Sequence, residues 1–196
     1  MRVFFASHNQ GNHTADSLTW NNNLYLPLCD VVGKKNVIRF NFDLFPFALH
    51  QDETIPANKT WLDANRPLLE TALLTQIKKA NAEKKIDVFF SYFASSYCSN
   101  EVIEEIKKLG IITINWFCNA SYQFYLIERI CSAYDYSLVP EKFRMEDYRK
   151  AGANPIYCCE AANPRIYKPI NVKQDMDVSF IGSRYADRFQ YVRALY

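Results

Sequence analysis

Short apolar runs alternate with longer stretches of helical periodicity along this chain. The clearest run covers residues 86–93, which are almost continuously apolar and rich in aromatic and β-branched side chains. A run of this kind predicts a strand that is buried on both faces, as in a parallel sheet. Similar runs predict further strands at residues 2–6, 36–40, 111–117, 136–139 and 155–159.

Helical periodicity fills most of the intervals between these runs. Residues 15–32 are expected to be helical, with Gly33 as the stop signal. Pro67 is expected in the first turn of the next helix, where its missing N–H costs little. Residues 41–59 are expected to be irregular because they contain Pro46 and Pro56. Further helices are predicted over residues 99–109, 122–133 and 141–151.

This order of elements predicts an α/β fold, a Rossmann-like parallel sheet with helices on both faces and right-handed crossovers. Ligands of such sheets bind at the carboxyl ends of the strands. The first strand is followed by a single glycine, Gly11, instead of the glycine-rich turn that a dinucleotide needs. The chain also contains no P-loop and no nucleophile elbow. The loops of interest are therefore 7–14, 94–98, 118–121 and 160–164.

The charge and cysteine content of the chain limit the classes of partner and the cellular compartment that we expect. The 196 residues include 23 Lys and Arg against 21 Asp and Glu, a net charge of +2, which is too small to indicate nucleic acid as a partner. The six cysteines form no CxxC and no zinc spacing, so we expect free thiols, no disulfide, no metal site and a cytoplasmic location. The first apolar run is too short for a signal peptide, and no segment is long enough for a transmembrane helix.

Several segments in the second half of the chain occur in a recognisable order. They are AYDYSLVP at 133–140, YRKAGA at 148–153, CEAANP at 159–164, YKP at 167–169 and DVSFIGS at 177–183 followed by Asp187 and Arg188. This succession resembles the CgeB-type spore-maturation and glycosyltransferase family, and the resemblance is best over residues 86–188. It implies the N-terminal half of a GT-B fold, in which two Rossmann-like domains face each other across a cleft.

The resemblance implies a division at about residue 169. Residues 1–169 would form the acceptor-side domain, and residues 170–196 would supply a linker plus the first strand and helix of a donor-binding domain. The implied activity is transfer of a sugar from a nucleotide-sugar donor to an unknown acceptor, with no bound cofactor. The alternative is a non-catalytic Rossmann-like module that binds a sugar or a protein partner.

Candidate site residues follow from this scheme. His8 directly follows the first strand and is a candidate base for an acceptor hydroxyl, although a loop histidine can also be merely solvated. Glu160 is a second catalytic candidate, with helix capping or salt bridging as its alternative role. Asn119 stands where many relatives have an acidic residue, so it can bind a sugar hydroxyl but cannot act as a base. The substrate-binding candidates are Ser7, Asn119, Ser121 and Asn163.

The donor diphosphate is expected near the turn after residue 181. A glycine there admits close backbone approach, and arginines can neutralise phosphate charge. The candidates are Gly182, Ser183, Arg184 and Arg188, of which the arginines have an exposed helix start as their alternative role. Residues 1–196 alone are expected to be inactive. The apolar residues Val178, Phe180 and Ile181 are expected to pack against the first domain or a neighbouring chain, which leaves self-association open.

Overall fold

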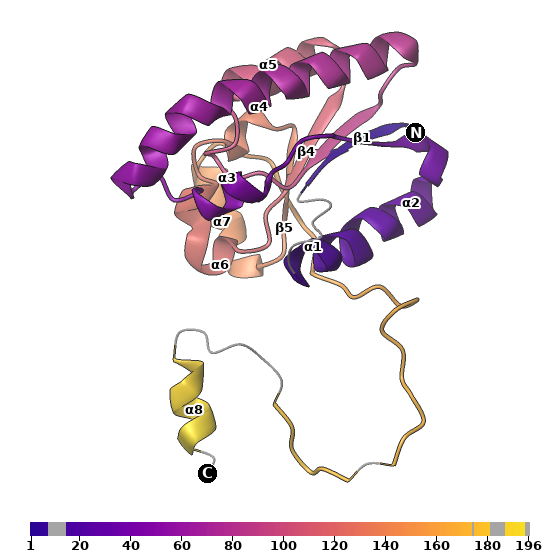
Figure 1. Ribbon diagram of the computed structural model, residues 1–196, viewed down its shortest axis with the longest axis vertical. Coiled ribbons are helices and arrows are strands. Elements are labelled where there is room, and N and C mark those ends of the chain that lie inside the picture. Colours follow the sequence, from indigo (N-terminus) through magenta and orange to yellow (C-terminus); the bar gives the residue numbers. More distant parts are fainter. Residues whose placement is uncertain (8–14, 174, 181–186, 195–196) are drawn as a thin grey trace. The chain divides into compact units, whose positions relative to one another are not determined.

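The computed structural model describes residues 1–7, 15–173, 175–180 and 187–194. The chain divides into two compact units, Met1–Ile166 and Tyr167–Tyr196. The first unit contains the sheet and most of the helices, and the second contains the helix α8, Arg188–Ala194 (Figure 1).

The first unit is built on a six-stranded sheet in the order β2-β1-β3-β4-β5-β6, in which every neighbouring pair is parallel. This arrangement confirms the predicted parallel α/β fold, and each strand lies inside its predicted run. The strands are β1 (Val3–Ala6), β2 (Val37–Arg39), β3 (Val88–Ser91), β4 (Ile112–Trp116), β5 (Tyr136–Val139) and β6 (Pro155–Tyr157).

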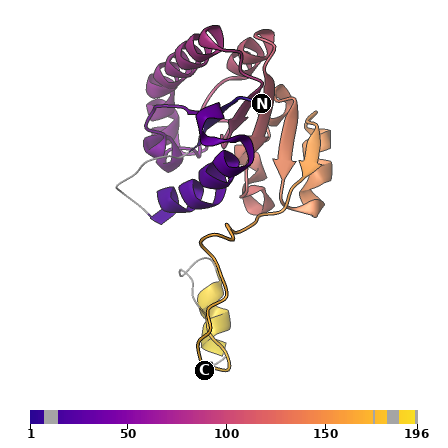
Figure 2. The ribbon, with the colours of Figure 1, turned by 90° about the vertical axis from the view of Figure 1, so that its right-hand side faces the viewer.

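Helices cover both faces of the sheet, as predicted (Figures 1 and 2). Because β2 and β3 flank β1 on opposite sides, right-handed crossovers place the β1–β2 connection on one face and the β2–β3 connection on the other. The first connection contains α1 (Ala15–Trp20), the π-helix η1 (Asn21–Tyr25), α2 (Leu26–Val32) and the 3-10 turn η2 (Lys34–Asn36). The second contains α3 (Phe45–Leu49) and α4 (Pro56–Glu83).

The connections from β3 to β4, β4 to β5 and β5 to β6 cross the sheet in the same direction as the connection from β2 to β3. Right-handed crossovers therefore place them on the same face as α4. They contain α5 (Asn100–Lys108), α6 (Ala120–Gln123) and α7 (Met145–Lys150). Three 3-10 turns complete them, namely η3 (Phe124–Leu126), η4 (Cys131–Ala133) and η5 (Lys142–Arg144).

The two faces of the sheet are buried to different extents. On the α4 face, Phe4, Phe89 and their neighbours belong to the large hydrophobic core. On the other face, Phe5 and Val37 form a smaller cluster with side chains from η1 and α2. That cluster does not extend over the far strands, where Ile112, Tyr136 and Ile156 are 47%, 36% and 45% exposed. The prediction of strands buried on both faces is therefore wrong for β4–β6, because only the β1–β2 crossover lies on that side.

A buried polar network fixes the loop that follows β3. The Asn115 side chain accepts a hydrogen bond from Phe93 N and donates one to Phe93 O, both at 2.9 Å. The Ser91 hydroxyl lies 2.8 Å from Asn115 Oδ1 and 2.9 Å from the Tyr134 hydroxyl. Because buried polar groups are costly unless paired, this satisfied network holds the backbone after β3 in one position.

Two helix predictions were wrong in their extent. The helix predicted from Pro67 begins at Pro56, and Pro67 lies inside it on an exposed turn. Both prolines fit the first turn of a helix, and burial of Leu62 in the core favours the earlier start. The helix predicted over residues 122–133 is broken into short turns, and Leu126 O in this segment accepts a hydrogen bond from Ser95 N at 2.6 Å.

The second unit differs from its prediction at one element. Residues 177–180 form no strand, and the rest of the predicted strand lies outside the described residues. A strand is stabilised by pairing with another strand, and the described part of this unit contains none. The predicted helix is present as α8.

Candidate functional site

The loops at the carboxyl ends of the strands form one edge of the parallel sheet. Ser7 follows β1 and is buried, Asn119 and Ser121 follow β4, and Glu160 follows β6 on an exposed segment. β1 and β6 are four strand spacings apart, about 19 Å. One small ligand therefore cannot contact both Ser7 and Glu160, although all four residues lie on the predicted edge. His8 lies outside the described residues.

Glu141 is the best-placed carboxylate on this edge. It is the second residue after β5, and its Oε1 accepts a hydrogen bond from Ser121 N at 3.2 Å. Its Oε2 is buried and has no hydrogen-bond partner among the residues that the structure describes. Burial raises the pKa of the Glu141 carboxyl, and the negative charge of Glu160 raises it further. A carboxylate of raised pKa at a strand end is suited to accept a proton.

Titratable side chains from several elements surround Glu141. Cys118 follows β4, Glu160 follows β6, and Tyr148 lies on α7; Glu141 interacts electrostatically with each of them. Arg144 contacts the same loop, since its Nε and Nη2 donate to Ser121 O at 3.2 and 2.6 Å. Burial raises the pKa of the Cys118 thiol to about 11, so this thiol is protonated at neutral pH and is not an activated nucleophile.

An aromatic wall borders this group. The Tyr92 hydroxyl lies 3.5 Å from Cys118 Sγ, and the Tyr92 ring contacts Trp20 at a centroid distance of 4.4 Å. Trp116 packs edge-on against Trp20 at 6.1 Å. Aromatic rings with a polar tip combine an apolar surface with hydrogen-bonding groups. The Glu141 group, defined as Cys118, Ser121, Glu141 and Glu160, therefore lies beside a cluster of packed aromatic rings, of which Tyr92 is only 5% exposed.

Asn163, one of the predicted substrate-binding residues, forms hydrogen bonds within the protein. Its side-chain amide donates to Asn22 O at 2.7 Å, its Oδ1 accepts from Arg165 N at 2.9 Å, and its backbone N donates to Asn23 Oδ1 at 2.9 Å. These bonds fasten the segment after β6 to the π-helix η1. The amide of this buried residue is directed at the protein backbone.

The predicted donor-binding residues belong to the second unit. Gly182, Ser183 and Arg184 lie outside the described residues. Arg188 is the first residue of α8 and is exposed. Their role therefore stays a prediction.

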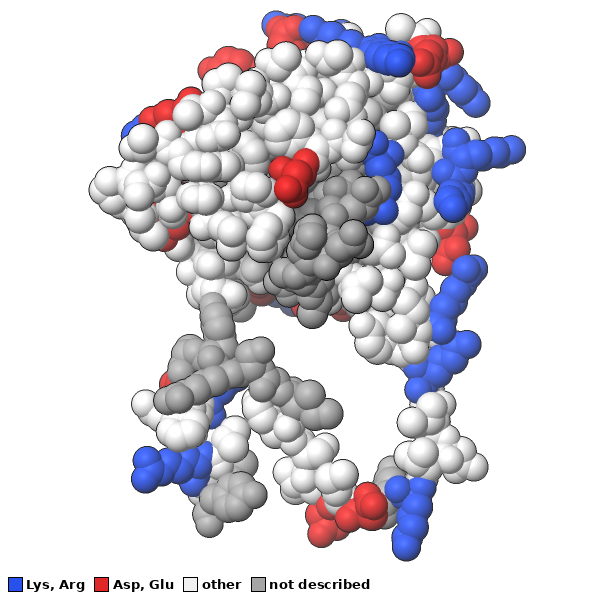
Figure 3. All heavy atoms as spheres, viewed as in Figure 1, with Lys and Arg blue, Asp and Glu red and all other residues white. Residues whose placement is uncertain are grey.

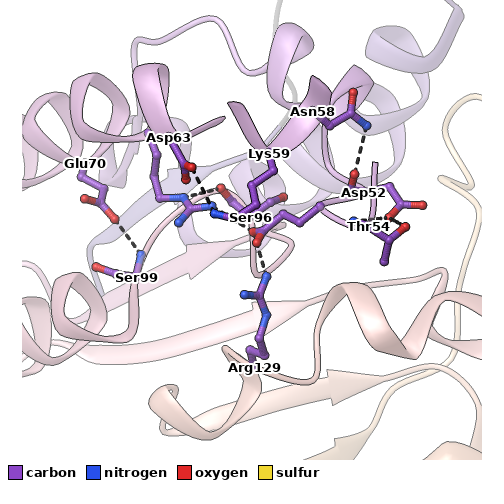
Figure 4. Close-up of polar contacts among 11 residues, drawn as sticks. Asp52, Thr54, Asn58, Lys59, Asp63, Glu70, Ser96, Ser99 and Arg129 are labelled. Carbon is purple, nitrogen blue, oxygen red and sulfur yellow. Dashed lines mark hydrogen bonds and ion pairs between the residues drawn. The ribbon is translucent and has the colours of Figure 1, made fainter. Parts of the chain in front are cut away.

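A polar pocket of about 330 Å³ lies elsewhere on the same edge. It is formed by segments that follow β2, β3 and β4. Figure 4 shows the polar contacts around it. The sequence indicated only the loop 94–98, and no residue of this pocket was predicted as a site residue. We call it the Ser95–Ser96 pocket, lined by residues 51–54, Lys59, Ser95, Ser96, Tyr125, Leu126 and Arg129.

Charges on the first unit are not gathered into one broad basic patch on the face seen in Figure 3, where Lys and Arg side chains follow the border. Within the described ranges, no three His, Cys, Asp or Glu side chains are grouped so that they could hold a metal ion. The thiols of all six cysteines are free. None of the helices in the described part of the chain combines the length and apolar character needed to cross a bilayer.

Comparison with models of known protein families gives no match to this chain, and comparison with curated proteins gives no significant match.

Proposed function

We propose that this chain is the acceptor-side domain of a GT-B-type glycosyltransferase, which transfers a sugar from a nucleotide-sugar donor to a hydroxyl group of an acceptor. The observation that supports this most directly is the Glu141 group. It combines a buried carboxylate oxygen that has no partner within the described ranges with a neighbouring aromatic wall, on the edge where parallel α/β sheets bind ligands.

In the proposed reaction, Glu141 accepts the proton of the acceptor hydroxyl. The acceptor oxygen forms a bond to the anomeric carbon of the donor sugar, and the bond from that carbon to the diphosphate oxygen breaks. The nucleoside diphosphate leaves with the electron pair. The residues proposed to contact the diphosphate are Gly182, Ser183, Arg184 and Arg188, and the cytoplasmic location expected from the six free thiols is part of the proposal.

A second candidate is favoured by the exposed apolar face of β4–β6. Ile112, Tyr136 and Ile156 form a surface that a protein partner could cover, as expected of a non-catalytic binding module. The two candidates differ in whether a nucleotide sugar is consumed.

The test is a transfer assay on the two-domain protein that this proposal implies. It would be incubated with UDP-, GDP- and TDP-sugars and with neutral mono- and disaccharides. We expect release of nucleoside diphosphate that depends on the saccharide, together with a saccharide product heavier by one glycosyl residue in mass spectrometry. Donor consumption that is independent of any acceptor would contradict transfer. The absence of consumption with every donor would favour the binding module.

A further inference from the structure

The Ser95–Ser96 pocket has a rigid charged side. Glu53 Oε1 accepts hydrogen bonds from Arg66 Nη2 at 2.9 Å and from Arg129 Nη2 at 2.7 Å. Arg66 is anchored in turn, since its Nε donates to Ser96 O at 2.9 Å. The side chains of Glu53 and Arg66 are only 17% and 23% exposed, whereas that of Arg129 is 63% exposed. Figure 4 shows Arg129 reaching from its own segment toward the others.

Two serines of the pocket lining, Ser95 and Ser96, have buried hydroxyl groups. Ser95 and Ser96 are 8% and 1% exposed, and the hydroxyl oxygen of each is buried without a hydrogen-bond partner in the part of the chain that the structure describes. Buried polar groups in native proteins are usually paired, and each exception calls for an explanation. A serine side chain has three staggered χ1 rotamers, so a ligand in the pocket toward which either hydroxyl rotates would provide one.

The charges of the lining select the class of ligand. Asp52 and Glu53 are balanced by Lys59 and Arg129, so the lining does not favour an anion such as phosphate. Asp52 Oδ1 accepts hydrogen bonds from the backbone N and the hydroxyl of Thr54, which lower the pKa of the Asp52 carboxyl and keep it ionised. Carboxylates accept hydrogen bonds, guanidinium groups donate them, and serine hydroxyls do both. This mixture suits a ligand with many neutral hydroxyl groups.

We propose that the Ser95–Ser96 pocket binds a neutral saccharide of one or two rings. The pocket volume of about 330 Å³ is at the small end of ligand sites, which limits the ligand to that size. The half-exposed ring of Tyr125 offers an apolar surface to the sugar. The pocket lining and the Glu141 group share no residue, so the role of this saccharide as the acceptor rests on the proposed function, whereas its binding to the pocket can be measured separately.

The test uses nuclear magnetic resonance on the isotope-labelled chain. The probes are glucose, galactose, N-acetylglucosamine and their 1,4-linked disaccharides, with inorganic phosphate as the charged comparison. We expect at least one saccharide, and not phosphate, to shift the backbone amide signals of Thr54, Ser95 and Ser96. Shifts caused by phosphate instead would overturn the assignment to a neutral ligand. No shift with any saccharide at tens of millimolar would overturn the proposal itself.

Substitutions of the two serines test whether the saccharide binds in this pocket. Ser96→Ala should weaken the affinity about three- to tenfold, the value of one lost hydrogen bond, and Ser95→Ala should act similarly. Neither change should lower stability, because neither hydroxyl has a partner among the described residues. Ser132→Ala, at an exposed serine outside the pocket, is the matched control and should bind like the wild type. Wild-type affinity in the double variant Ser95→Ala/Ser96→Ala would exclude the pocket.

A substitution at an exposed residue of the pocket lining, Arg129, keeps the proposal testable if a serine variant fails to fold. Arg129→Gln changes a mostly exposed side chain and should weaken binding at least threefold, while Arg149→Gln, an exposed arginine on α7, should not. Equal affinity in both variants would contradict the proposal. Saccharide binding without sugar transfer would refute the proposed function alone. Transfer whose KM is unaffected by the pocket variants would refute the pocket alone.

Discussion

Glu141→Gln is expected to lower the rate of sugar transfer by about 10²- to 10⁴-fold, the usual contribution of a positioned general base. Glutamine keeps the size of the side chain and can still accept the hydrogen bond from Ser121 N, but its amide cannot take a proton. Saccharide binding in the Ser95–Ser96 pocket should be unchanged. The measurement is acceptor-dependent release of nucleoside diphosphate by the two-domain protein.

The matched control is Glu146→Gln, which removes an exposed carboxylate on α7 that pairs with Arg149. It should transfer sugar at the wild-type rate. Equal rates in Glu141→Gln and the wild type would remove Glu141 from the mechanism and return attention to His8 and Glu160.

Glu141→Gln should not lower stability, although it lowers the rate of sugar transfer. The folded state raises the pKa of Glu141, so between the ordinary value of 4.5 and the raised value the folded chain binds more protons than the unfolded chain. The contribution of Glu141 to stability is therefore present at low pH and is lost as the pH rises through that window. Glu141→Gln should be at least as stable as the wild type at pH 7 while losing activity, as expected for a functional group that is costly to bury.

Phe89→Ala is expected to destabilise the first unit by about 3–5 kcal/mol. Phe89 is fully buried in the centre of the sheet, and its ring packs between Phe4, Phe93 and Tyr134 at centroid distances of 6.1–6.4 Å. Truncation would leave a cavity that the surrounding strands cannot close. Domains of this size are typically stable by only about 5–15 kcal/mol, so the loss would be a large fraction of the total.

Urea denaturation of the variant and the wild type measures this difference. The control is Phe143→Ala at a phenylalanine that is 67% exposed, which should change stability by no more than about 0.5 kcal/mol. A loss below about 1 kcal/mol in Phe89→Ala would mean that the core is not packed as described.

The sheet could be predicted because its signal is local. A buried strand appears in the sequence as a short apolar run, such as residues 86–93. Each of the six strands lies within an apolar run from which it was predicted. The break in the predicted helix 122–133 could not be predicted, because this segment packs against residues distant in sequence, as in the hydrogen bond from Ser95 to Leu126, 31 residues away. The uncovered face of β4–β6 likewise depends on strand order, which the apolar runs do not specify.

The sequence predicted that the site lies at the carboxyl ends of the strands, but it did not identify Glu141 or the Ser95–Ser96 pocket. The sequence placed Glu141 in the first turn of a helix, whereas the structure starts η5 at Lys142 and leaves Glu141 between β5 and η5. Glu141 was therefore not among the predicted site residues, which named His8 and Glu160 as the catalytic candidates. The Ser95–Ser96 pocket joins Glu53 to Arg129 across 76 residues, and only the fold brings these residues together.

The most direct test is a titration of the Glu141 side-chain carboxyl by carbon-13 nuclear magnetic resonance, with and without a saccharide that binds the chain. We expect the pKa of Glu141 to lie above 4.5 in the free protein and to change further when a hydroxyl of the acceptor saccharide contacts the carboxylate, while the exposed Glu146 signal does not respond to the saccharide. A Glu141 carboxyl that titrates at 4.5 and is unaffected by every saccharide would contradict the central claim that this edge receives the acceptor.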